Sequence, residues 1–209
     1  MQAKPLTPDS DQPVVLTKRQ QQALITKDKI FTAAMDVINR KGFNNATIEE
    51  ITSQAGVASG SFYTYFKSKE SIIVDTVRRS DAYYAYAYQQ LTPDTFPAML
   101  TQFMRLSYTK YEKRGKGIIK AIISNYFAFP HDTFYPKDRA LLQCLNKLVS
   151  QALKTGELSK AHLKADYVTQ ILSVMSGVEV QWCFDDTDKS LADMMEDTIY
   201  TLASGMVNQ

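Results

Sequence analysis

Apolar residues recur at intervals of three and four positions along most of the chain, the spacing that places them on one face of an α-helix. Proline is absent between residues 14 and 92 and again after residue 136, so long helices can run through these stretches. No segment shows a convincing alternation of β-branched and polar residues, which is typical of strands. The pattern predicts an all-α protein with about nine helices.

Glycine, proline and acidic turns mark the ends of the expected helices. The first helix starts near Lys18 or near Thr26 and ends at Lys41, because Gly42 follows. The remaining eight are expected over residues 47–55, 59–65, 68–91, 94–113, 117–128, 136–155, 165–184 and 188–207.

Residues 47–66 read TIEEITSQAGVASGSFYTYF and predict two short helices joined by a tight turn. Thr47 and Glu50 fit a capping box, in which each side chain accepts a hydrogen bond from the other residue's amide. Gly56 can adopt a positive φ at little cost, so the chain can reverse direction there. We expect a small core between these helices and the first helix, made of Ile48, Ile51, Val57 and Phe62 against Ile30, Ala34, Val37 and Ile38.

The second short helix carries small or uncharged polar groups on its outer face. Such groups exchange hydrogen bonds with bases and phosphates and add little bulk, which suits entry into a DNA major groove. Lys69 follows Ser68, the expected cap of the next helix, and a lysine there can hold a phosphate. Two helices joined by a glycine turn also occur in ordinary bundles, so these residues alone leave both interpretations open. The outer-face residues are Ser59, Gly60, Ser61, Tyr63 and Thr64.

The string from Thr47 to Glu70, together with Ile30…Ala33-Ala34…Gly42-Phe43 upstream and Ser71-Ile72-Ile73 downstream, resembles the signature of the tetracycline-repressor (TetR) family of bacterial transcription regulators. The resemblance covers about residues 25–75, and beyond residue 80 it extends only to length, helical make-up and a turn at 155–158. The chain departs from the pattern at Ala58, where many members have serine or threonine, so the helix starts after either Ala58 or Ser59. The resemblance implies that Lys69 holds a phosphate and that these residues face DNA: Thr47, Ser59, Gly60, Ser61, Tyr63 and Tyr65.

The domain organisation that the resemblance implies has three parts. A flexible tail covers residues 1–20, a helix-turn-helix DNA-binding domain covers 21–70 with its motif at about 47–66, and a helical effector-binding and dimerisation domain covers 71–209. Members dimerise through their last two helices, so we expect a homodimer that binds a palindromic operator in double-stranded DNA, with half-sites about 34–36 Å apart. The apolar stripes that serve as core, and that can continue into a partner, are Val168, Ile171, Leu172, Met175, Val178 and Trp182, then Leu191, Met194, Met195, Ile199, Leu202 and Met206.

Aromatic residues crowd the middle helices, and the resemblance places an effector pocket there. Aromatic and methionine side chains suit an apolar, aromatic or flat cationic small molecule, although core or surface positions also explain most of these residues. We expect ligand binding to shift the helix at 68–91 and respace the two DNA-binding domains, which releases a repressor from its operator. The candidate pocket residues are Tyr86, Phe103, Tyr126, Met175 and Trp182; other aromatic residues nearby are Tyr83, Tyr84, Tyr88, Tyr108, Tyr111, Phe127 and Phe129.

Composition adds little to this picture. Among 209 residues 44% are hydrophobic and the net charge is +2, as in ordinary globular proteins. Residues 1–80 carry 11 Lys and Arg against 8 Asp and Glu, whereas residues 81–209 carry 13 against 14, so a polyanion is expected near the N-terminal third. Neither a signal peptide nor a run of 18 apolar residues is evident, and we expect a cytoplasmic protein without membrane contact.

The residues that could support catalysis or metal binding are few. Cys144 and Cys183 lack metal-ligand spacing and are expected as reduced, buried thiols, while His131 and His162 fall in expected loops. No HExxH, GxGxxG, P-loop or nucleophile-elbow motif occurs, so no catalytic residue, metal or cofactor is expected. Alternatives are a helical dimeric adaptor, a constitutive DNA binder without an inducer, and an all-helical enzyme that uses scattered carboxylates.

Overall fold

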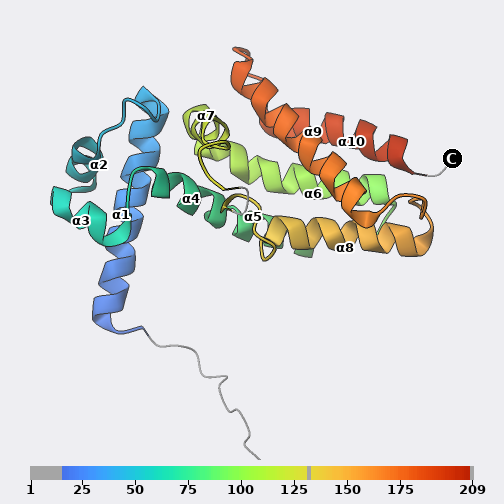
Figure 1. Cartoon of the computed structure of the whole chain (residues 1–209), viewed down its shortest axis with the longest axis horizontal. Helices are drawn as coiled ribbons and strands as arrows, with labels where there is room; N and C mark the ends of the chain where they lie inside the picture. Colours follow the sequence, from blue (N-terminus) through green and yellow to red (C-terminus); the bar gives the residue numbers. More distant parts are fainter. Residues whose placement is uncertain (1–15, 131–132, 208–209) are drawn as a thin grey trace, which may run out of the picture.

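The computed structural model describes residues 16–130 and 133–207, and over these residues it consists of α-helices joined by turns (Figure 1). This confirms the all-α expectation. A short 3-10 helix, η1 (Glu112–Arg114), links two of the helices. The α-helices are α1 (Lys18–Lys41), α2 (Ile48–Ala55), α3 (Ser59–Tyr65), α4 (Glu70–Arg79), α5 (Asp81–Gln89), α6 (Phe96–Tyr111), α7 (Lys116–Ser124), α8 (Ala140–Thr155), α9 (Lys164–Phe184) and α10 (Leu191–Met206).

The nine expected helices are present in the described ranges, and the fourth of them is divided at Ser80 into α4 and α5. The Ser80 hydroxyl donates to the carbonyl of Thr76 (3.1 Å), and the Ser80 amide donates to the carbonyl of Val77 (3.2 Å), three residues back. Serine side chains that bond to the preceding turn in this way interrupt or bend helices. We call residues 77–81 the α4–α5 joint.

Some helix ends differ from the expectation. Ser68 does not cap α4: its amide donates to the Ser71 hydroxyl (3.2 Å), and the helix begins two residues later at Glu70. Similarly, α8 begins at Ala140, four residues after Pro136. A local turn also precedes α8, where the Arg139 amide donates to the Pro136 carbonyl (3.0 Å), and local periodicity does not reveal such turns.

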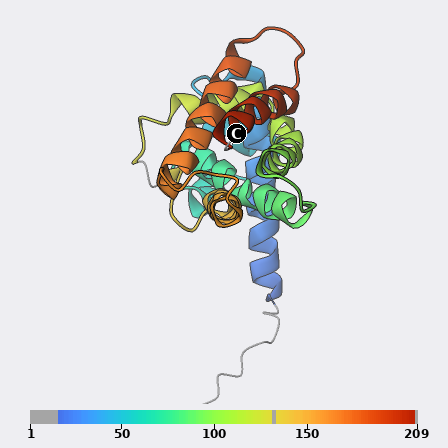
Figure 2. The same ribbon diagram turned by 90° about the vertical axis from the view of Figure 1, so that its right-hand side faces the viewer.

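The first three helices form a small N-terminal unit. The helix α1 begins at Lys18, the earlier of the two expected starts, because Thr17 and Gln20 form a capping box. Ile51 and Phe62 are fully buried against α1, and Ile48 and Val57 pack at the edge of the same core, as expected. The N-terminal half of α1 extends beyond the rest of the molecule in both views (Figures 1 and 2).

The helices from α5 onwards form the larger unit, with α6 at its centre. The side chains of Leu100, Phe103 and Tyr108 on α6 are completely buried, and α6 packs against α5, α8 and α10. The inner faces of α9 and α10 confirm the expected core stripes, in which Leu172, Met194, Leu202 and Met206 are only half-buried. Figure 1 shows α9 and α10 at the end of the molecule opposite α2 and α3.

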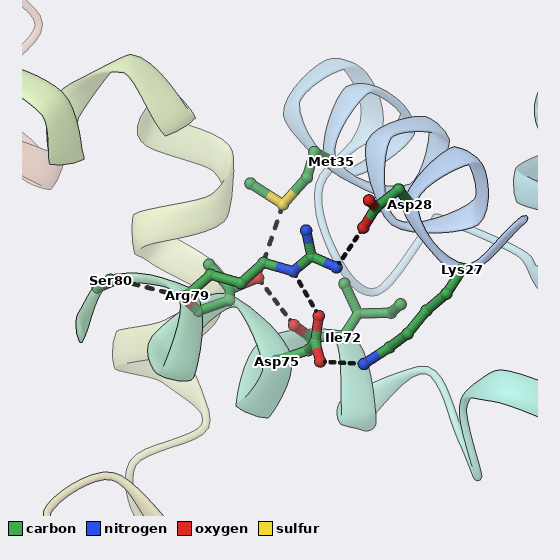
Figure 3. A network of polar contacts seen from close by, with 8 residues as sticks. Lys27, Asp28, Met35, Ile72, Asp75, Arg79 and Ser80 are labelled. Atoms are coloured by element: carbon green, nitrogen blue, oxygen red, sulfur yellow. Dashed lines mark hydrogen bonds and ion pairs between the residues drawn. The ribbon is translucent and has the colours of Figure 1, made fainter. Parts of the chain in front are cut away.

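Charged side chains join α1 to α4. Figure 3 shows Asp75 between two cations: its carboxylate lies 2.7 Å from Lys27 Nζ and 2.6 Å from Arg79 Nε, and Arg79 also pairs with Asp28 at 2.7 Å. Burial alone raises the pKa of Asp75, but the hydrogen bonds from both cations outweigh it, so the pKa is lowered. This network couples the position of α1 to the helix that leads into the larger unit.

A second contact between the units involves Asn39 on α1. Its side chain donates to the carbonyl of Arg114 (2.6 Å) and accepts from the amide of Ile118 (3.1 Å). Gly115 and Gly117 lie against it: a Cβ on Gly117 would come within 2.7 Å of Asn39 Cα. The two glycines therefore allow α7 to approach α1 directly.

Candidate nucleic-acid interface and effector cavity

The chain reverses between α2 and α3 in the way the sequence predicts. The Thr47 hydroxyl accepts from the Glu50 amide at 3.2 Å, and Gly56 ends α2 in the left-handed region with a φ of 66°. The expected reciprocal half of the capping box is wrong. The fold brings Lys41 next to Glu50, and the carboxylate forms an ion pair with Lys41 at 2.8 Å instead.

The outer face of α3 is exposed and polar because its one large apolar residue points inward. Phe62 is completely buried, whereas the Tyr63 side chain is 62% exposed. Ala58 occupies the cap position and provides no side-chain hydrogen bond, so the helix starts directly after it. Of the candidate DNA-binding residues, Thr47, Ser59, Gly60 and Tyr63 are exposed, and Ser61 and Tyr65 are half-buried.

Lys69 is engaged with the protein itself. Its ammonium donates to the carbonyls of Phe43 (2.6 Å), Ala46 (2.9 Å) and Asn44 (3.4 Å) and lies 4.6 Å from the centre of the Phe43 ring. Lys69 therefore holds the segment in front of Thr47 against the start of α4. A phosphate contact by Lys69 stays a prediction.

The larger unit and the end of α4 line a cavity of about 30 Å³, close to the volume of one water molecule. Two of the five candidate effector residues, Tyr126 and Met175, line it. Phe103 is buried in the adjacent core without lining it, and Tyr86 is 45% exposed beneath Lys110. Trp182 donates to the carbonyl of Lys189 (2.8 Å) and so holds the loop after α9. Six aromatic residues form much of the wall: Tyr84, Tyr108, Tyr111, Tyr126, Phe134 and Tyr135.

A buried carboxylate lies in the same wall. Glu179 on α9 is 5% exposed and accepts hydrogen bonds from the hydroxyls of Tyr108 (2.6 Å) and Tyr126 (3.3 Å). Burial raises the pKa of Glu179 to about 7, although the two tyrosine hydrogen bonds and the nearby Arg139 act in the opposite direction. The same burial raises the pKa of Tyr108. Glu179 can therefore change its protonation state near neutral pH.

Arg139 connects the cavity wall to the α4–α5 joint. Its Nε lies 3.0 Å from the Asp81 carboxylate, and its other nitrogens donate to the carbonyls of Phe134 (2.6 Å) and Val77 (3.3 Å). Val77 and Ser80 of the joint also line the cavity. A change in the cavity can therefore reach α4 through one guanidinium group.

Comparisons with known proteins agree with this arrangement. The model for bacterial regulatory proteins of the tetR family matches residues 30–76. The uncharacterized HTH-type transcriptional regulator YvdT of Bacillus subtilis is 48% identical over 46 residues, which are 22% of this chain and 24% of that protein. The fatty acid metabolism regulator protein of Bacillus subtilis is 23% identical over 204 residues, covering 87% of this chain and 95% of that protein. Residues 30–76 of this chain therefore match the tetR family of regulators.

A solved structure of the TetR-like fold supports the architecture as a whole. The transcriptional regulator FadR from Bacillus subtilis, in complex with stearoyl-CoA, matches with a TM-score of 0.71 at 18% identity, covering 85% of this chain and 98% of that one. The matched segment and these relatives support a DNA-binding transcription regulator, and the relatives named here are regulators rather than enzymes.

The remaining candidate residues lie outside the interface and the cavity wall. Cys144 and Cys183 are unpaired and buried, as expected, and burial raises the pKa of the Cys183 thiol to about 11. His162 lies in an exposed loop, and His131 lies outside the described residues. Within the part of the chain that the structure describes, no group of acidic, histidine or cysteine residues could hold a metal, and no helix is long and apolar enough to cross a membrane.

Sequence reasoning missed Glu179 and Arg139. Glu179 is the single charged residue between Tyr167 and Cys183. It lies one helical turn after Met175, a candidate effector residue, and this placement on the same helix face could have indicated that Glu179 also lines the cavity. Arg139 had no comparable signal, because its partners lie up to 62 positions away in the sequence.

Proposed function

We propose that the protein is a homodimeric, ligand-responsive repressor that binds a palindromic operator through α3 and leaves it when a small molecule occupies the cavity. The observation that carries the proposal is the exposed polar face of α3, held above the buried Phe62 by the reversal at Gly56. A helix presented in this way can enter a major groove while its inner side stays packed.

The roles of the interface residues follow from their exposure. Tyr63 is 62% exposed and can contact bases or the sugar-phosphate backbone. Gly60 allows close approach of the helix because it carries no side chain, and the space at its Cβ position is open. Thr47 stands at the start of α2 and can donate to a phosphate. Lys69 contributes positive charge and holds the loop in front of Thr47 in place.

Dimerisation through α9 and α10 accounts for the faces that these helices leave exposed. Ser173 and Gly177 on α9 are exposed, and the large side chains of Phe184 (78%) and Tyr200 (57%) are exposed on α9 and α10. Small residues allow two helices to approach closely, and aromatic residues stabilise interfaces. A twofold dimer doubles the number of base contacts, which one seven-residue helix cannot supply alone.

Release is proposed to pass through the α4–α5 joint. A ligand that needs more space than the cavity offers must displace wall residues, among them Val77 and Ser80. Arg139 holds Val77 and Asp81, and Asp75 holds α1, so movement of the joint changes the orientation of the N-terminal unit. The ligand needs only a higher affinity for the displaced arrangement than for the DNA-bound one.

The proposal is tested by selecting bound fragments from random duplex DNA with the purified full chain. We expect an inverted repeat, and light scattering should give twice the chain mass of 23.6 kDa. Tyr63→Ala should weaken binding to the selected site at least tenfold, whereas Tyr86→Ala, an exposed tyrosine outside the cavity wall, should not. The logarithm of the affinity for DNA should fall steeply and linearly with the logarithm of the salt concentration.

Lys69→Ala should weaken binding to all duplexes alike, because Lys69 contacts no base in this proposal. If the purified chain binds no duplex at low salt, DNA binding by α3 is refuted. If it binds but no small molecule weakens the complex, the protein is a constitutive DNA binder.

A further inference from the structure

The wall of the cavity carries one carboxyl group that forms no ion pair with a described cation of the protein. Among the described residues, no lysine or arginine nitrogen lies within ion-pair distance of Glu179, whose recorded partners are two tyrosine hydroxyls. A buried carboxylate without a counter-ion is costly, so such groups are normally paired or protonated. The cavity is therefore complementary to a positive charge that the protein does not itself provide.

Arg139 is not paired with Glu179, because its charge is balanced by another carboxylate. Its guanidinium bonds to Asp81, Phe134 and Val77, and Asp81 balances its charge. The pair is neutral, so an ionised Glu179 leaves the cavity with a net charge of one negative unit. An anionic ligand would be repelled by this charge.

The other parts of the wall suit the same kind of ligand. Tyr84, Tyr108, Tyr111 and Tyr126 surround the carboxylate, and the faces of aromatic rings attract cations, most strongly where water is excluded. We propose that the effector is an organic cation with an apolar or aromatic body, whose positive group pairs with the Glu179 carboxylate between these rings. The inference deepens the proposed ligand-responsive function and rests on it.

An acyl chain fits this wall less well, although the FadR structure from Bacillus subtilis contains stearoyl-CoA. A hydrocarbon chain placed against Glu179 would separate the carboxylate and the tyrosine hydroxyls from water without offering them a hydrogen bond. A cation instead satisfies the carboxylate and can displace the wall at Ser80 as it enters, because the cavity holds only about 30 Å³. The displacement of the cavity wall that admits the cation is then the same displacement that is proposed to release the DNA.

The test uses two molecules of the same shape. Phenyltrimethylammonium has a positively charged quaternary nitrogen where tert-butylbenzene has a neutral carbon. The ratio of their affinities therefore measures the preference of the cavity for a positive charge. Calorimetric titration of the full chain without DNA, at pH 8 where a pKa of about 7 leaves Glu179 ionised, should give at least tenfold tighter binding of the cation. Stearoyl-CoA is titrated in parallel.

Variants assign the preference to Glu179. Glu179→Gln keeps the size of the side chain and should abolish the preference for the cation, whereas Asp186→Asn, in the exposed loop after α9, should retain it. The inference is overturned if the wild-type chain binds the two molecules equally, if Glu179→Gln keeps the preference, or if stearoyl-CoA binds and the cation does not. The ratio of the two affinities measured for the wild-type chain tests the preference for a cation even if Glu179→Gln folds poorly.

The failure of this inference can be told apart from the failure of the proposed function. If the cation binds at Glu179 but never weakens the DNA complex, the ligand class holds and ligand-responsive repression fails. If a ligand of another class releases the DNA, repression holds and the cation assignment fails.

Discussion

Glu179 makes the stability of the protein depend on pH in a direction opposite to that of most carboxylates. Burial raises its pKa from the ordinary value of 4.5 to about 7. Below pH 4.5 the group is protonated in both the folded and the unfolded chain. Between pH 4.5 and pH 7 only the folded chain keeps the proton, so the free energy of unfolding falls as the pH rises.

The size of this effect follows from the displacement of the pKa. Each unit is worth about 1.4 kcal/mol, so the full interval corresponds to a loss of about 3 kcal/mol for the wild-type chain. Glu179→Gln has no proton to lose and should lack this contribution. The difference between variant and wild type should therefore change by about 3 kcal/mol, in favour of the variant at high pH.

Urea denaturation at several pH values between 4 and 9, at one protein concentration, measures this difference. Asp186→Asn removes an exposed carboxylate and should give a difference that stays constant with pH. If the Glu179→Gln difference is equally constant, the folded protein already compensates the ionised carboxylate, and the premise of an unneutralised charge in the cavity is refuted.

Three further predictions concern the N-terminal unit and its contacts. Gly117→Ala should lower the free energy of unfolding by about 1–3 kcal/mol in chemical denaturation, because its Cβ would meet Asn39 on α1; an unchanged value would show that α7 can move away freely. Gly60→Ala should stabilise the fold by up to about 1 kcal/mol yet weaken DNA binding in gel shifts, and unaltered DNA binding would argue against close approach at this position. Asp75→Asn should cost about 1–2 kcal/mol at neutral pH by leaving two cations unpaired. The pKa of Asp75 is lowered in the fold, so this difference should shrink as the pH falls below 3.8; a loss that persists in acid would assign the effect to packing.

The sequence by itself determined the parts of the protein that depend on neighbouring residues. The helical class, the reversal at Gly56 and the inward position of Phe62 follow from periodicity, capping and the conformational freedom of glycine, all of which act over a few positions. The residues that carry the family resemblance lie in this same short stretch, which is why the DNA-binding unit could be recognised before its structure was known.

The tertiary structure alone decided how the larger unit uses its aromatic and charged residues. Tyr84 and Tyr86 are two positions apart, about 200° around the helix, and only the packing of α5 against α6 and α8 determines that Tyr84 is buried and Tyr86 exposed. Glu179 and Arg139 acquire their surroundings from segments more than 50 positions away. Burial, charge pairing and the wall of a cavity are properties of elements brought together from distant parts of the chain, and a local pattern does not contain them.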